Sequence, residues 1–119
     1  LTRAMTGLRR HIYLEEEFLF PPLRAAGMVM PIFVMLKEHG QLWAAMAAVD
    51  ALLAADSDSD TMLAACRDLL AQLDAHNSKE EPIIYTQADT VLSQTASAEL
   101  STFLRAGRMP DGWVCAKAA

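Results

Sequence analysis

Residues 11–21 read His-Ile-Tyr-Leu-Glu-Glu-Glu-Phe-Leu-Phe-Pro, and residues 76–86 read His-Asn-Ser-Lys-Glu-Glu-Pro-Ile-Ile-Tyr-Thr. The two stretches align without a gap as His-x-x-x-Glu-Glu-x-apolar-apolar-aromatic, so His11 and Glu15 recur as His76 and Glu80. This internal repeat predicts two helices related by a pseudo-twofold axis, each presenting the same pair of side chains.

The histidine and the glutamate of each pair share one helix face. Side chains four positions apart on a helix have Cβ atoms about 5–6 Å apart, so an imidazole and a carboxylate can reach one metal ion. Both pairs lie in line with apolar residues and are expected to face the core, next to Leu8, Phe18, Leu73 and Ile83. Buried carboxylates are costly without a compensating charge, and no Lys or Arg occupies a neighbouring inward position. A bound cation is the simplest compensation.

The third histidine, His39, lies on an apolar stripe between Leu36 and Leu42 and is expected to face the same centre. Three imidazoles and two carboxylates suit iron, manganese or zinc, and two carboxylates that can each bridge favour a pair of ions. No thiolate is near them in the sequence, which disfavours a cysteine-rich zinc site or an iron–sulfur cluster. Ferritin-like di-iron bundles use Glu-x-x-His, with the opposite order and a shorter spacing, and are also disfavoured.

Along the rest of the chain, apolar residues recur with helical spacing, and no segment shows the alternation of a strand. The chain is therefore predicted to be an all-α helical bundle and a single domain over residues 1–119. The predicted elements are a helix over 2–20 ended by Pro21 and Pro22, one from Pro31 to about 55, one over 61–91 kinked or opened at Pro82, one over 97–106, and a tail over 107–119 that packs back on the bundle.

Composition excludes several partners. The 119 residues are 53% hydrophobic and carry a formal charge of −5 with only ten Lys and Arg, which removes the basic surface that nucleic acids or anionic membranes require. The longest apolar run, from Met28 to Leu36, is too short to cross a bilayer. The two cysteines, Cys66 and Cys115, are far apart and are interpreted as reduced thiols, which favours the cytoplasm.

With these motifs, the chain resembles the hemerythrin-like domains, also called His-His-Glu cation-binding domains. That family has an up-and-down four-helix bundle around a non-haem di-iron centre, held by one His on the first helix, His-x-x-x-Glu on the second, His on the third and His-x-x-x-Glu or a relative on the fourth. In this chain, His11 with Glu15 matches the second-helix pair, His39 the third-helix ligand, and His76 with Glu80 the last pair.

The resemblance implies two non-haem iron ions, with manganese or zinc as substitutes, and O2 or NO as a ligand for sensing, storage, detoxification or iron-centre repair. It departs from the family in one respect, because no histidine precedes His11 to match the first helix. The glutamate at position 80 is nearer to the bacterial sensor and repair branch than to the oxygen carriers. Tyr13 and Tyr85 are candidates to line the site and donate hydrogen bonds to a bound ligand.

Simpler interpretations stay open at this point. His39 alone is typical of a hydrogen-bonded core residue, His11 with Glu15 of a surface pair, and Glu16 and Glu17 of a solvated helix face. A di-iron peroxidase or NO reductase, in which Tyr85 or Glu81 serves as acid or base, and a metal-free helical interaction domain are the alternatives to a gas- or iron-binding module.

The apolar content is high for three long helices that cover one another, which suggests an open wall. We expect a helix upstream of Leu1 that carries at least one histidine, or a second copy of the chain, to fill it.

Overall fold

The computed structural model describes residues 1–118, with residues 89 and 90 described in their backbone only. Its elements, in chain order, are α1 (Thr2–Leu14), η1 (Glu15–Leu19), α2 (Phe20–Ala25), α3 (Val29–Ala54), α4 (Ser59–Glu80), η2 (Glu81–Tyr85), α5 (Thr86–Val91) and α6 (Gln94–Ala106), where η marks a π-helical turn. No strand occurs among the described residues. The predicted all-α helical bundle is confirmed.

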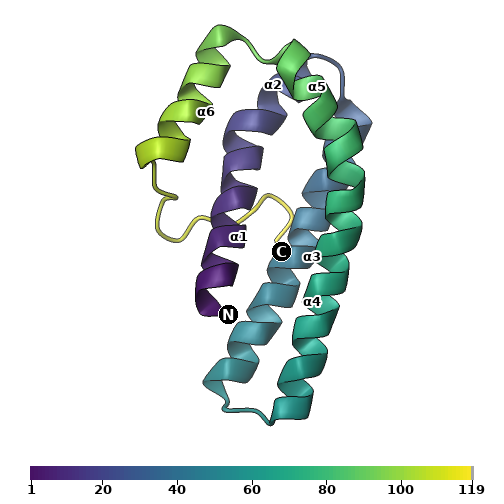
Figure 1. Ribbon diagram of the computed structural model, residues 1–119, viewed down its shortest axis with the longest axis vertical. Helices are drawn as coiled ribbons and strands as arrows, with labels where there is room; N and C mark the ends of the chain where they lie inside the picture. The colour runs from purple at the N-terminus through teal and green to yellow at the C-terminus, as the bar shows by residue number, and fades with distance from the viewer. Residues whose placement is uncertain (119) are drawn as a thin grey trace.

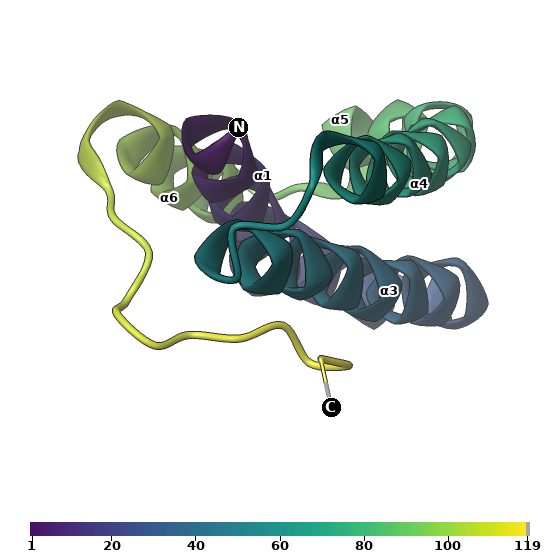
Figure 2. The same cartoon turned by 90° about the horizontal axis from the view of Figure 1, so that it is seen from below.

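Three continuous helical rods form the bundle (Figure 1). The first comprises α1, η1 and α2, the second is α3, and the third comprises α4, η2 and α5. The helices α3 and α4 form an antiparallel hairpin, while the shorter α6 lies beside the first rod on the side away from α4. The chain after α6 passes beneath α1 and reaches α3 (Figure 2).

Pro21 and Pro22 were expected to end the first helix at Phe20, and this expectation is wrong. Both prolines lie inside a helical segment that continues to Ala25, directly after the π turn η1. Proline lacks an N–H and crowds the carbonyl of the preceding turn. The wider π turn removes the regular i→i−4 pattern at that place, so the helix continues through both rings.

Pro82 has the expected effect on the third rod, because it lies in the π turn η2 between α4 and α5. The start of α4 is set by Asp58, whose carboxylate accepts the N–H of Thr61 at 2.8 Å. The last helix begins at Gln94, three residues earlier than expected, because the Ser93 hydroxyl caps it by accepting the N–H of Ala96.

The buried apolar residues form two clusters. One joins η1, α2, α3 and the end of the third rod, and its members are Leu19, Phe20, Leu23, Ile32, Met35, Leu36, Ile84 and Ala88. The other joins α1, α3, α4 and the tail, and its members are Met5, Ile12, Leu42, Met46, Val49, Leu69 and Cys115. The buried polar side chains, Glu15, His39, His76 and Glu80, come from chain positions between these two sets on each rod. They form a polar layer inside an apolar bundle.

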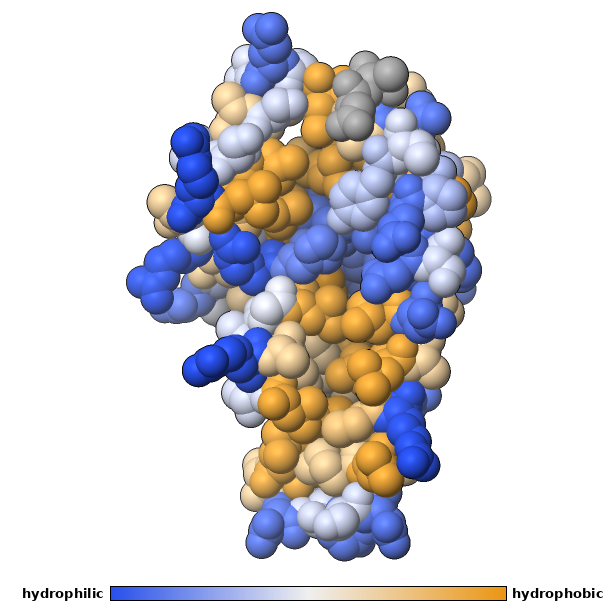
Figure 3. Space-filling model, viewed as in Figure 1, coloured by the Kyte–Doolittle hydropathy of each residue, from blue (hydrophilic) through white to orange (hydrophobic). Residues whose placement is uncertain are grey.

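One side of the bundle is open. An apolar groove runs between α1 and α4, lined by Leu1, Ala4, Met5, Leu8, Cys66, Leu69, Leu70 and Leu73, and Figure 3 shows apolar side chains gathered on this face. Ile83 was expected to lie next to the core-facing pair, but it is exposed, and so are Leu63 and Leu70. Leu70 lies along this groove, whereas Ile83 lines a separate apolar hollow with Met30, Pro31 and Val34.

Candidate metal centre

Four of the five predicted ligands meet inside the bundle. Glu15, His39, His76 and Glu80 are all buried, and each offers a ligand atom within 4.8 Å of the others. They come from the three rods, since Glu15 opens η1, His39 lies in the middle of α3, and the other two end α4. Residues from both copies of the repeat and the histidine of α3 therefore come together at one place inside the bundle.

Both imidazoles are held by carboxylates through Nδ1. The Nδ1 atom of His39 donates to Glu16 Oε2 at 2.7 Å, and the Nδ1 atom of His76 donates to Glu38 Oε1 at 2.9 Å. Glu38 also pairs with the ammonium group of Lys79. A carboxylate on one ring nitrogen selects the tautomer whose other nitrogen carries a free lone pair, the arrangement common around metal-binding histidines.

The free lone pairs point at other acceptors. His39 Nε2 lies 3.1 Å from Glu15 Oε1, and His76 Nε2 lies 3.1 Å from Glu80 Oε2. Glu15 Oε1 and His39 Nε2 are fully buried and, among the described residues, form no well-aligned hydrogen bond despite their proximity. Acceptors that face one another in a dry core need a cation or a proton between them. The donor set of imidazole nitrogen and carboxylate oxygen fits iron, manganese or zinc.

In the metal-free chain, a proton lies between Glu15 and His39. Burial alone lowers the pKa of His39, but the carboxylates of Glu15 and Glu16 outweigh it and raise that pKa to about 9. Burial likewise raises the pKa of Glu15, yet contact with His11 and His39 brings it far below its usual range. For Glu80, burial is the larger effect and the pKa is raised. The pKa values of the two carboxyl groups of the layer are therefore displaced in opposite directions.

The fifth predicted ligand, His11, lies at the edge of this group rather than within it. Its side chain is 50% exposed, and its Nε2 atom is 3.5 Å from Glu15 Oε2. The phenol of Tyr85 stands between the two, because its O–H donates to Glu15 Oε2 at 2.6 Å and its oxygen lies 3.2 Å from His11 Nε2. Burial and the nearby carboxyl groups of Glu15 and Glu80 raise the pKa of Tyr85, so the phenol stays protonated as a donor. The repeat is thus asymmetric: His76 is buried where His11 is not.

Tyr13, the other tyrosine expected to line the site, is placed elsewhere. Its ring packs against Phe18, Phe103 and Trp113, with centroids 5.0–6.1 Å apart, in an aromatic cluster between the first rod, α6 and the tail. Helical spacing explains the difference, since Tyr13 is two residues after His11 and points to another face of α1.

Sequence reasoning missed the two carboxylates that hold the imidazoles. Glu16 was assigned to the solvated face, but its side chain is only 5% exposed and contacts His39. Glu38 was given no role, although it directly precedes His39 in the sequence. The available signal for Glu16 was the run of three glutamates that begins at Glu15, where the π turn η1 brings the first two carboxylates inward.

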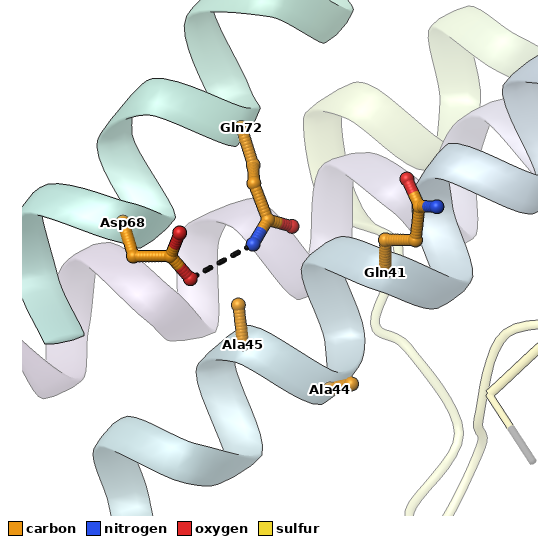
Figure 4. A pocket seen from close by; sticks show the side chains of 5 residues that line it. All are labelled: Gln41, Ala44, Ala45, Asp68 and Gln72. Carbon is orange, nitrogen blue, oxygen red and sulfur yellow. Dashed lines mark hydrogen bonds between the residues drawn. The ribbon is translucent and has the colours of Figure 1, made fainter.

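A polar hollow, distinct from the polar layer, lies between α3 and α4 and is lined by Gln41, Ala44, Ala45, Asp68 and Gln72 (Figure 4). Its one charged group, Asp68, accepts a hydrogen bond from the Gln72 amide at 2.9 Å. This hollow is separate from the polar layer and offers one carboxylate, which is too little to hold a cation.

A family comparison supports the same interpretation. The model of the hemerythrin HHE cation-binding domain matches residues 1–88, which include every residue of the polar layer. The chain belongs to the hemerythrin HHE cation-binding family. Neither a curated protein nor a solved structure matches this hemerythrin-family chain significantly. No helix in the described part of the chain is both long and apolar enough to cross a membrane.

Removal of a ligand should empty the site, while removal of its neighbour should not. We expect His76→Ala and Glu80→Ala to weaken iron binding more than about tenfold, because loss of even an outer partner of a ligand costs that much. The exposed neighbours provide matched controls, Asn77→Ala and Glu81→Ala, which should keep the affinity of the parent chain. Anaerobic titration with Fe²⁺ against a chelator measures the change. Equal affinity in all four variants, at equal helicity, contradicts ligation by His76 and Glu80.

Proposed function

We propose that this chain is a non-haem iron protein in which His11, Glu15, His39, His76 and Glu80 bind two iron ions, with manganese or zinc as substitutes. The observation that carries the proposal is the pair of buried atoms Glu15 Oε1 and His39 Nε2, which lie 3.1 Å apart without a well-aligned hydrogen bond. A cation between acceptors replaces the proton that His39 otherwise retains. Two carboxylates in one layer support the assignment of two ions rather than one.

The proposed ligand is O2 or NO. Ferrous iron supplies a reducing centre with a coordination position for a diatomic gas. The chain supplies an apolar surround from two core clusters, the half-exposed His11, and the phenol of Tyr85, whose single O–H proton, donated to Glu15 in this structure, can turn to a bound gas. These features support gas sensing, storage or detoxification, and the same ligands support storage of iron or its delivery to damaged iron centres.

We infer a reducing compartment, the cytoplasm, because Cys66 and Cys115 are both free thiols. The charge of −5 supports a small-molecule partner rather than a nucleic acid.

For the apolar groove between α1 and α4, we propose a helix from outside residues 1–119 or a second copy of the chain as its cover. The solution mass of the chain distinguishes these two.

Exposure of the reduced, iron-loaded protein to O2 or NO tests the function. We expect a new charge-transfer absorption that reverses when the gas is removed. Tyr85→Phe should speed gas release several-fold with unchanged iron content, because it deletes one hydrogen-bond donor. Tyr13→Phe is the matched control and should release gas at the parent rate. An unchanged spectrum contradicts gas binding, and steady consumption of reductant indicates an enzyme instead.

Metal affinity should rise with pH. Since the pKa of His39 is about 9 in the metal-free chain, a metal ion must displace its proton at any lower pH. The affinity for Mn²⁺ should therefore increase by up to about tenfold per pH unit between about pH 6 and 8, with proton release on binding. Calorimetry in buffers of different ionisation enthalpy measures both quantities. A flat affinity with no proton release contradicts ligation by His39.

A further inference from the structure

The C-terminal tail, residues 107–118, packs directly against the helix that carries His39. Gly40 is the contact point, because a Cβ atom built at this position would collide with the backbone carbonyl of Lys117. Cys115 anchors the same segment, since it is 2% exposed within the apolar cluster of α1, α3 and α4. The tail therefore reaches α3 one residue away from a predicted metal ligand.

Glu16 connects the tail to that ligand. Its Oε2 atom accepts the hydrogen bond of His39 Nδ1 at 2.7 Å, and its Oε1 atom accepts the backbone N–H of Ala116 at 2.9 Å. The next glutamate, Glu17, accepts the indole N–H of Trp113 at 3.1 Å. Two successive carboxylates of the π turn η1 are thus tied to the tail, and one of them also holds the imidazole.

We propose that Glu16 is a positioning residue for His39 and that the docked C-terminal tail completes the metal centre by holding Glu16 in place. This inference rests on the proposed metal binding. The Ala116 N–H fixes one carboxylate oxygen, so the other remains aimed at His39 Nδ1 and keeps His39 Nε2 free for the metal. Without the tail, the Glu16 carboxylate gains water as a partner and freedom to rotate, and the orientation of His39 is less restricted.

The tail lies outside residues 1–88, the part of the chain that the family model covers. Apolar cover is the competing role for the tail, because Trp113 packs on Trp43 with ring centroids 5.5 Å apart. A tail that only covers apolar surface affects stability but leaves metal affinity unchanged. Metal affinity therefore distinguishes the two roles.

The variant Gly40→Ala in the full chain distinguishes coupling to the metal centre from simple apolar cover. The added methyl group cannot coexist with the Lys117 carbonyl, so the tail must shift, while alanine favours the α3 helix over glycine. Gly7→Ala is the matched control, because it makes the same change within α1, where nothing lies within 4 Å of the new methyl group. We expect Gly40→Ala to weaken Mn²⁺ affinity about tenfold and Gly7→Ala to leave it unchanged.

A double-mutant cycle tests whether Glu16 carries the effect. Glu16→Gln should weaken Mn²⁺ affinity about 10- to 100-fold, because an amide has one acceptor oxygen and its NH2 group would face either the Ala116 N–H or the His39 Nδ1–H. In the Glu16→Gln background, Gly40→Ala should cost less than about twofold, since the coupling is already lost. A full additive loss in that background overturns the role of Glu16.

Two further measurements keep the proposal open to refutation if Gly40→Ala folds poorly. Ala116→Pro removes the N–H donated to Glu16, besides restricting the backbone at residues 115 and 116, and it should weaken Mn²⁺ affinity as Gly40→Ala does. In the parent chain, Mn²⁺ should slow amide hydrogen exchange at Ala116, because coupling between two sites is reciprocal. Parent-like affinity in the Gly40 and Ala116 variants overturns the tail coupling alone, whereas absence of Mn²⁺ and Fe²⁺ binding in the parent chain overturns the proposed function itself.

Discussion

Two buried carboxylates that face two imidazole lone pairs are the constraint on which the rest of this structure depends. Glu15 and Glu80 oppose His39 and His76 at 3.1 Å, inside a bundle whose other buried side chains are apolar. Such a layer is unfavourable unless a proton or a metal ion lies between the acceptors. The metal-free chain uses a proton on His39, and a metal ion is the alternative that the donor atoms suit.

The surrounding structure keeps the lone pairs in this arrangement. Glu16 and Glu38 bind the far nitrogens of the two imidazoles, and Lys79 neutralises Glu38. The π turns η1 and η2 each adjoin a layer glutamate and change the direction of the side chains that follow. Helix irregularities of this kind cost stability, which indicates that the chain retains them for the geometry of the layer.

Much of this arrangement could be predicted from the sequence, because helical spacing relates His76 to Glu80 and places His39 on an apolar stripe. The exposure of His11 was not predicted, because helical spacing alone places it on the same face as Glu15, whose side chain is buried. The path of the chain through Pro21 and Pro22 also escaped prediction, because local propensity favours a helix end there and only the π turn accommodates both rings. The inward turn of Glu16 depends on the same π turn and on contact with the distant Ala116.

Anomalous diffraction from iron-soaked crystals of the full chain locates bound iron directly. A metal centre in the polar layer predicts anomalous density at the iron edge among Glu15, His39, His76 and Glu80, and its disappearance in crystals of Glu80→Ala. Iron density elsewhere in the molecule, or a polar layer that stays free of metal at saturating Fe²⁺ with His39 still protonated, would contradict it.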